Sequence, residues 1–211
     1  MVQRLIAKIV ARRQEIAPTR ALLVGISGID GSGKGFITAK VAESLGKSGD
    51  ATRVAVIGAD AWLNLPAARF RRENPAEHFY AHAFRFEEMF ERLVLPLQRN
   101  RAITLRMDYA EETSKSHREH RYQFQNIDVI LLEGIFLFQA RFLKYFDLTC
   151  WVECSFETAL ARALQRGQER LSAAETRRAF GTIYFPAQRI HFERDAPQTR
   201  ADIILPNERE G

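Results

Sequence analysis

Apolar runs alternate along this chain with segments whose apolar residues recur at helical spacing. The apolar runs predict strands over 21–27, 53–58, 127–133, 147–153 and 201–205. The segments between them predict helices over 2–16, 34–46, 83–99, 137–144, 155–166, 172–184 and 186–194. Because residues 127–132 are almost continuously apolar, we expect a strand that is buried on both faces. This alternation predicts an α/β fold in which helices cover both faces of a parallel sheet.

One segment interrupts the alternation. Residues 101–126 contain two strand-like stretches, 103–107 and 121–124, on either side of a polar and charged tip, which predicts an inserted hairpin. The amphipathic N-terminal helix, within residues 1–18, precedes the first strand. The length of 211 residues suits one hydrophobic core, so we expect a single domain over 1–211.

The first strand leads into a glycine-rich turn with the spacing of a phosphate loop. The turn and the start of the next helix read Gly28-Ile29-Asp30-Gly31-Ser32-Gly33-Lys34-Gly35-Phe36. Glycines let main-chain N–H groups approach an anion, the helix start adds positive potential, and Lys34 reaches the outer phosphates. The alternative is a glycine-rich turn with no ligand, and the strand–turn–helix context argues against it. We therefore predict that residues 28–36 bind a nucleotide.

Three carboxylates follow predicted strands, where α/β sheets hold their ligands. Asp60 follows the second strand, Glu133 ends the buried strand, and Asp108 ends the first arm of the hairpin. A carboxylate beside a phosphate loop commonly holds Mg²⁺, which we predict for Glu133; the alternative is a surface acid at a strand end. Asp60 could bind the metal or take a proton from a hydroxyl nucleophile, and its structural alternative is a turn cap.

Arginines recur late in the chain at a helical interval. Arg162, Arg166 and Arg170 lie four residues apart and would share one face of a helix. Arginines that close over a triphosphate neutralise the charge that develops during phosphoryl transfer. The alternative is a solvated helix face with surface ion pairs. Among the aromatic residues between strands, Trp62, Phe84 and Tyr109 are candidates to stack on a ligand, although core packing is the ordinary role of such residues.

Composition adds little beyond this picture. The net charge of +5 suits small anionic substrates; with no nucleic-acid module in the sequence, we expect no nucleic-acid partner. Cys150 and Cys154 lie in one predicted strand, too far apart to bridge within it, so we expect free thiols and a cytoplasmic location. The sequence contains no apolar run of membrane-spanning length, and we expect no membrane partner.

Four stretches together resemble the uridine kinase and phosphoribulokinase family. They are residues 25–34, Asp60, the run Ile130-Leu131-Leu132-Glu133-Gly134-Ile135 and the run Arg200-Ala201-Asp202-Ile203-Ile204-Leu205-Pro206. The resemblance covers almost the whole chain from residue 21 and implies the three-layer P-loop NTPase fold. In that fold five parallel strands have the order 2-3-1-4-5, and a mobile lid would occupy residues 162–185.

The resemblance also implies a reaction: transfer of the γ-phosphoryl group of ATP, with Mg²⁺, to a hydroxyl of a small molecule. By position, Asp60 matches the catalytic base and Glu133 the metal-associated acid, while Arg162 and Arg166 match the start of the lid. We accordingly predict catalytic roles for Lys34, Asp60, Arg162 and Arg166, and ATP binding by residues 28–36 and Arg170. The stretch after Leu205 matches the loop beside the adenine.

The chain departs from the family at the acceptor side. Gly35 replaces the hydroxyl that touches the metal, His82-Ala83-Phe84 stands for Asp-Ala-Phe, and Met107-Asp108-Tyr109 stands for Tyr-Asp-Phe. The predicted acceptor contacts are Asp60, Trp62, His82, Phe84, Asp108 and Tyr109. We expect a nucleoside such as uridine or cytidine as acceptor. The alternatives are a sugar phosphate, a pantothenate-like alcohol, or a nucleotide-binding regulator with weak or no kinase activity. Self-association into a homo-oligomer stays open.

Overall fold

The computed structural model describes residues 2–47, 52–110, 113–167 and 171–208. Its main sheet contains five parallel strands: β1 (Leu22–Gly28), β2 (Val54–Gly58), β5 (Val129–Gly134), β6 (Leu148–Glu153) and β7 (Ile203–Pro206). They lie in the order β2-β5-β1-β6-β7. Counted along the chain, this is the predicted order 2-3-1-4-5, and the predicted α/β fold class is confirmed.

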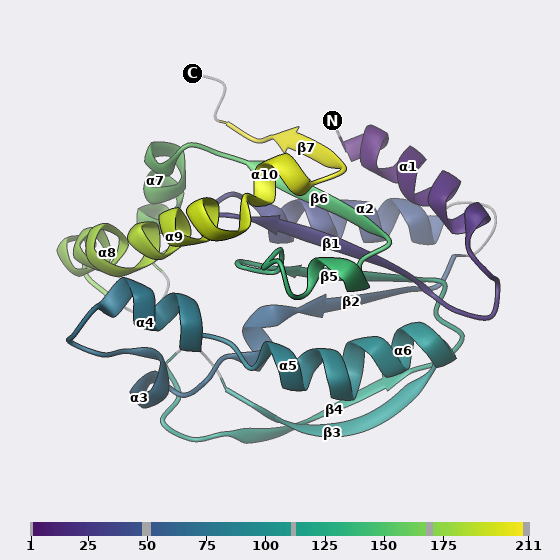
Figure 1. The fold of residues 1–211 in the computed structure, drawn as a ribbon, viewed down its shortest axis with the longest axis horizontal. Helices are drawn as coiled ribbons and strands as arrows, with labels where there is room; N and C mark the ends of the chain where they lie inside the picture. The colour runs from purple at the N-terminus through teal and green to yellow at the C-terminus, as the bar shows by residue number, and fades with distance from the viewer. Residues whose placement is uncertain (1, 48–51, 111–112, 168–170, 209–211) are drawn as a thin grey trace.

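Helices cover both faces of this sheet (Figure 1). On one face, α1 (Val2–Glu15) and α2 (Lys34–Lys47) pack on alternate strand residues such as Leu22 and Val24. On the other face, Leu23 and other strand residues belong to a second cluster. It includes Phe79 of α4 (Pro75–His82) and apolar residues of the helical segments within 86–97 and 180–187. Alternate side chains of a strand point to opposite faces, so these strands are apolar throughout and their two faces contribute to two separate hydrophobic clusters.

The predicted hairpin forms as a separate two-stranded antiparallel sheet. Its strands are β3 (Ile103–Tyr109) and β4 (Arg118–Phe124), in a register that pairs Asp108 with Glu119. Tyr122 stacks on Trp62 with ring centroids 6.2 Å apart, and Arg85 donates a hydrogen bond to the main-chain oxygen of Asp108. Both contacts attach the hairpin to the main body.

Two long helices contain a short π-helical segment each. The first consists of α5 (Phe86–Met89), η2 (Phe90–Val94) and α6 (Leu95–Asn100). The second consists of α8 (Ala173–Ala179), η5 (Phe180–Tyr184) and α9 (Phe185–Asp195). In each, a proline lies at the start of the α-helical part after the π segment. The wider π turn lets the helix continue although proline lacks the N–H of a regular helix. Two separate helices over 172–184 and 186–194 were therefore the wrong expectation.

The predicted helix over 137–144 is also wrong. The chain turns sharply at Phe136, whose φ of 59° is left-handed, and continues in turns to the short 3₁₀ helix η3 (Leu143–Tyr145). The N–H of Ala140 donates to the Asp195 carboxylate instead of to a helical carbonyl. The apolar residues here are core contacts of a loop, not one face of a helix.

Several short helices have no counterpart in the predictions. They are η1 (Ala59–Trp62), α3 (Pro66–Arg69), α4 and α10 (Pro197–Arg200). All but η1 start at a proline in the first helical turn, where its missing N–H has no intrahelical partner to lose. Helix α7 (Phe156–Arg166) lies close to its predicted bounds, with the Ser155 hydroxyl accepting a hydrogen bond from the N–H of Thr158.

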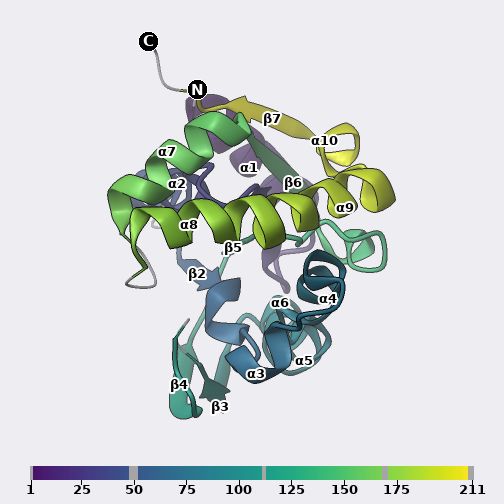
Figure 2. The same ribbon diagram turned by 90° about the vertical axis from the view of Figure 1, so that its left-hand side faces the viewer.

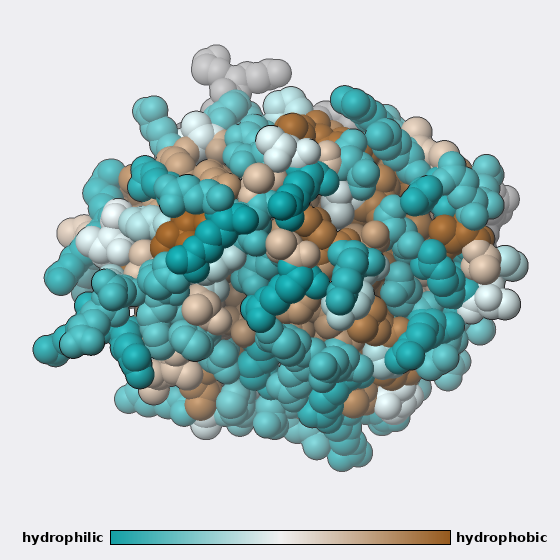
Figure 3. Space-filling model, in the orientation of Figure 1, coloured by the Kyte–Doolittle hydropathy of each residue, from teal (hydrophilic) through white to brown (hydrophobic). Residues whose placement is uncertain are grey.

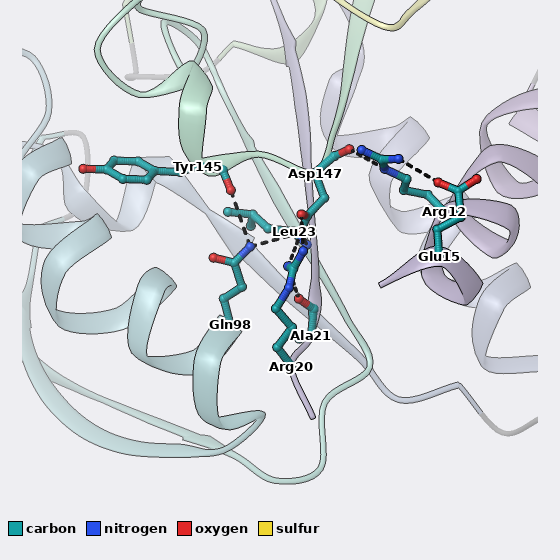
Figure 4. A network of polar contacts seen from close by, with 8 residues as sticks. All are labelled: Arg12, Glu15, Arg20, Ala21, Leu23, Gln98, Tyr145 and Asp147. Atoms are coloured by element: carbon teal, nitrogen blue, oxygen red, sulfur yellow. Dashed lines mark hydrogen bonds and ion pairs between the residues drawn. The ribbon is translucent and has the colours of Figure 1, made fainter. Parts of the chain in front are cut away.

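A half-buried ion pair holds the amino-terminal end of the sheet together (Figure 4). Asp147, just before β6, accepts two hydrogen bonds of 2.7 Å from Arg20 and one of 2.9 Å from the N–H of Leu23. Gln98 of α6 adds a fourth at 3.0 Å. Burial opposes ionisation, but the hydrogen bonds from Arg20 and Leu23 outweigh it and lower the pKa of Asp147. The ion pair thereby links β1, α6 and β6.

The opposite, carboxyl-terminal end of the sheet carries the longer connections. Figure 2 looks onto this end, with α7, α8 and α9 above the strands and the segment from β2 to α3 and the hairpin below. The face seen in Figure 3 is largely hydrophilic, and its apolar patches are small and separated by polar side chains. In the described part of the chain, every helix is too short or too polar to cross a bilayer.

Candidate active site

The phosphate loop connects the end of β1 at Gly28 to the start of α2 at Lys34. Two of its glycines have left-handed backbones, with φ of 80° at Gly31 and 85° at Gly33. A Cβ atom would lie 2.6 Å from the main-chain oxygen of Ala159 at Gly31, and 2.5 Å from Nδ2 of Asn207 at Gly33. Only glycine fits this geometry, which brings the loop and the start of α2 to one cavity.

This cavity, of about 430 Å³, contains most of the predicted phosphate-site residues. Its lining residues are Asp30, Gly31, Gly33, Lys34, Gly35, Phe36, Asp60, Glu133, Arg162, Gln165 and Arg166. Three predicted nucleotide-binding residues do not line it. Gly28 packs against the main chain of Val152, and Ile29 and Ser32 are buried beneath the loop. These three residues support the loop from the side away from the cavity.

Two carboxylates face Lys34 across the cavity. Asp60 lies in η1 directly after β2, and Glu133 lies on the neighbouring strand β5, paired in register with Gly58. Asp60 is exposed where it opens onto the cavity, but the protein atoms around its carboxylate reduce its solvation and raise its pKa, which Lys34 partly offsets. Burial likewise raises the pKa of Glu133; Lys34 again lowers it, and nearby Asp60 raises it further.

The donor set fits a magnesium ion that is held mostly by water and phosphate. Asp60 and Glu133 offer carboxylate oxygens, the ligands that Mg²⁺ prefers, and their desolvated charges favour a nearby cation. A Cβ atom at Gly35 would meet nothing within 4 Å, so water has room where a hydroxyl is absent. Within the described ranges, no group of three or more His, Cys, Asp or Glu is placed to hold a metal ion by itself.

Arg162 of α7 reaches back over the phosphate loop. Its Nη1 donates to the main-chain oxygen of Ser32 at 3.2 Å, and its Nη2 donates to that of Asn207 at 2.8 Å. Arg162 therefore braces the loop as well as lining the cavity. Arg166 lines the same cavity one turn further on, whereas Arg170 lies outside the described residues. Gln165 was missed, although its spacing of three from Arg162 puts it on the same helix face.

The stretch after β7 lies against the phosphate loop. Asn207 donates from Nδ2 to the main-chain oxygen of Ser32 at 2.6 Å, and its main-chain N–H donates to the main-chain oxygen of Glu153 at 2.8 Å. Glu208 accepts hydrogen bonds from the N–H and hydroxyl of Ser155 and from the hydroxyl of Thr158. The family resemblance pointed to the stretch after Leu205 but to neither residue singly, because only the fold brings the end of β7 beside this loop.

A second cavity, of about 40 Å³, adjoins the first. Asp30, Lys34 and Asp60 line both. The remaining walls of the smaller cavity are Leu63, Arg69, Phe79, Phe84, Ile135 and Tyr184. Of the predicted acceptor contacts, Asp60 and Phe84 lie here. Arg69 and Tyr184 were missed, because they come from a four-residue helix and from a π-helical segment with no recognisable pattern.

Four other predicted acceptor contacts do not line either cavity. Trp62 is 1% exposed and packs on Tyr122 in the core, which corrects its assignment as a ligand contact. His82 is exposed at the end of α4, with its ring 4.5 Å from that of His78. Asp108 is exposed on the hairpin, and the ring of neighbouring Tyr109 lies 5.9 Å from that of His120. The hairpin and the end of α4 thus leave these side chains outside the site.

Comparisons with known proteins identify a matching family and relatives of the same fold. Residues 23–172 match the Phosphoribulokinase / Uridine kinase family. The chain is 26% identical over 192 residues to a uridine kinase from Limosilactobacillus reuteri, covering 89% of this chain and 84% of that protein. Two solved structures share the fold over nearly the whole of both chains. A "possible uridine kinase" from Bacillus stearothermophilus has a TM-score of 0.74 at 20% identity, covering 97% of this chain and 96% of that one.

The second solved structure is D-glycerate 3-kinase from Cryptococcus neoformans var. grubii serotype A. It has a TM-score of 0.69 at 14% identity, covering 100% of this chain and 98% of that one. The family match extends from β1 through the phosphate loop, both cavity carboxylates and the whole of α7. The chain therefore belongs to the phosphoribulokinase and uridine kinase family.

Proposed function

We propose that the protein is an ATP-dependent kinase that transfers the γ-phosphoryl group to a hydroxyl of a small molecule. The observation that carries this proposal is the grouping of Lys34, Asp60 and Glu133 at one cavity with the phosphate loop. A site that only bound nucleotide would have no need for a carboxylate beside the phosphate loop whose raised pKa suits proton transfer. The two buried free cysteines support the expected cytoplasmic location.

In this proposal the chain positions two substrates and moves one proton. Lys34 and the main-chain N–H groups at the start of α2 hold the β- and γ-phosphates. The acceptor hydroxyl loses its proton to the Asp60 carboxylate, and its oxygen bonds to the γ-phosphorus. The bond from that phosphorus to the bridging oxygen breaks, and ADP leaves with the electron pair. Arg166 lies where it would offset negative charge on the transferring group.

Magnesium would be held by Glu133 and Asp60, chiefly through water, and would neutralise phosphate charge when bound. The lid proposed over 162–185 would begin at Arg162 and Arg166, both of which line the cavity. Closure of such a lid would exclude water and so protect the phosphoryl group from hydrolysis.

A second candidate is a nucleotide-binding regulator with weak or no kinase activity. Gly35 favours it, because the hydroxyl that normally contacts Mg²⁺ is absent.

Within the kinase class, the similarity to an L. reuteri uridine kinase favours a nucleoside such as uridine or cytidine as the phosphoryl acceptor. Against a nucleoside, His82, Asp108 and Tyr109 do not line either cavity.

The test separates the two candidates by measuring ADP release with ATP and Mg²⁺, with and without added hydroxyl compounds. A kinase releases ADP in proportion to an added acceptor, whereas a regulator does not respond to one. Lys34→Ala should lower this turnover at least about 100-fold, because the ammonium group that holds the outer phosphates is lost. Lys47→Ala, at the exposed end of the same helix, is the matched control. Undiminished turnover in Lys34→Ala would reject the kinase assignment.

A further inference from the structure

The smaller cavity beside Asp60 has a different character from the larger one. Gly35, Glu133, Arg162 and Arg166 line only the larger cavity, which suits phosphates and metal. The smaller cavity has apolar walls, such as Phe84 and Ile135, and contains one further cation, Arg69. Asp60 stands where the two cavities meet. An acceptor in the smaller cavity could therefore present a hydroxyl to Asp60 and to a γ-phosphate in the larger cavity.

Arg69 is held rigidly in the wall of the smaller cavity. It is 2% exposed and ends the short helix α3, where its N–H donates to the main-chain oxygen of Leu65 at 3.1 Å. Its guanidinium carbon lies 5.0 Å from the centre of the Phe70 ring, and that ring stacks on Phe79 at 5.6 Å. A hydrogen bond of 2.8 Å between His78 and the main-chain oxygen of Ala68 ties α3 to α4. The cation is thus fixed by packing before any ligand arrives.

We propose that the phosphoryl acceptor is a small hydroxylated anion whose carboxylate or phosphate group binds Arg69 in this cavity. The inference rests on the proposed kinase activity and narrows its substrate class. A guanidinium group held among aromatic rings binds an anion strongly, because charge-assisted hydrogen bonds gain strength where water is scarce. The volume of about 40 Å³ accommodates roughly a few water molecules and so favours a compact group over a nucleoside base.

The first experiment uses the unmodified protein and matched pairs of acceptors. Each pair contains the same hydroxylated carbon skeleton with and without its charge: a hydroxy acid and its amide, and a sugar phosphate and its free sugar. Uridine and cytidine are added as neutral nucleosides. We expect kcat/KM from ADP release to be about 10–100-fold higher for the charged member of at least one pair. The pair that shows the difference distinguishes carboxylate from phosphate.

The second experiment changes the cation. Arg69→Met should raise KM for the charged acceptor about 10–100-fold and leave the dissociation constant of ATP within about 2-fold, since Arg69 does not line the larger cavity. Arg69→Lys should retain part of the preference for the charged acceptor, because lysine keeps the positive charge but lacks the planar guanidinium group that can donate two parallel hydrogen bonds. Arg71→Met is the matched control, an exposed arginine in the same segment, and should behave as the wild type.

The outcomes separate this inference from the proposed function. Turnover of uridine or cytidine that exceeds every charged acceptor would overturn the anion site and leave the kinase activity standing. If no acceptor yields ADP, the proposed function fails, and calorimetric binding of the same pairs, with a non-hydrolysable ATP analogue present, decides the anion site. Equal affinity within every pair overturns it. Because that comparison is made on the wild-type protein, it does not depend on the Arg69 variants folding.

Discussion

Two aspartates, Asp60 and Asp195, show how the same side chain serves chemistry in one place and architecture in another. Asp195 is 5% exposed and accepts hydrogen bonds from the hydroxyl of Tyr80, from Nδ1 of His191 at 2.7 Å and from the N–H of Ala140 at 2.9 Å. Burial opposes its ionisation, but the hydrogen bonds of His191 and Tyr80 outweigh burial and lower its pKa.

For Asp60, the influences on the pKa have the opposite outcome. Burial is the largest influence on it and raises its pKa, while Lys34, Arg69 and Arg166 lower it only through space. Its carboxylate faces two cavities, whereas that of Asp195 ties α9 to α4 and to the loop after β5. The comparison teaches that an aspartate whose carboxylate is hydrogen-bonded within the fold stabilises the structure. An aspartate whose carboxylate faces a cavity is available to a ligand.

The largest expected effect is on catalysis at Asp60. Asp60→Asn should lower kcat by about 10²–10⁴-fold, because the amide cannot accept the proton of the acceptor hydroxyl. The measurement is ADP release at saturating ATP and acceptor. Asp195→Asn, assayed below its melting temperature, should retain most of the activity. An Asp60→Asn enzyme with near wild-type kcat would remove Asp60 from its role as base.

The same two substitutions should affect stability differently. Asp195→Asn should lower the free energy of unfolding by about 2 kcal/mol, because it weakens hydrogen bonds to a charged group. Asp60→Asn should leave that free energy unchanged or raise it at neutral pH, because it removes a desolvated charge. Urea unfolding followed by circular dichroism measures both. If both variants lost stability equally, the distinction between the two aspartates would be wrong.

Acid pH should sharpen the comparison further. The folded-state pKa of Asp60 lies above its ordinary value of 3.8, so kcat/KM should fall, as pH decreases, with a midpoint above that value. The folded-state pKa of Asp195 is lowered. The stability that Asp195 contributes is therefore fully present above its unfolded-state pKa and is lost as the pH falls through its folded-state pKa. Activity should therefore decline at a higher pH than the stability owed to Asp195. Coincident declines in the pH profiles of kcat/KM and unfolding would contradict this.

The smallest expected effect is at Gly35. Gly35→Ser should fold normally, since a Cβ atom there meets nothing within 4 Å. The added hydroxyl should lower the Mg²⁺ concentration needed for half-maximal binding of a non-hydrolysable ATP analogue, by a few-fold. Gly46→Ser, at a second glycine of α2 with open space around it, is the matched control. An unchanged Mg²⁺ requirement in Gly35→Ser would place the metal away from this position.

Most of the residues that local sequence patterns predicted for the phosphate side line one cavity. The spacing of Gly31, Gly33 and Lys34 specifies a turn whose geometry depends on its own backbone. The apolar runs specify two strands, one that ends shortly before Asp60 and one that contains Glu133 near its end. Of the six residues predicted for the acceptor side, only Asp60 and Phe84 line a cavity. Trp62 carried the expected aromatic signal but packs in the core, and Arg69 carried no signal although it lines the cavity.

The sequence by itself therefore determined most of the helices and strands and the phosphate loop. Both depend on a few neighbouring residues, through the spacing of apolar side chains and the backbone freedom of glycine. Tertiary structure alone decided which side chains meet around Asp60. Arg69 from α3, Ile135 after β5 and Tyr184 from η5 come from separate parts of the chain and share one cavity. Their meeting depends on how helices pack on the sheet, and that packing is a property of the whole fold, which no local pattern records.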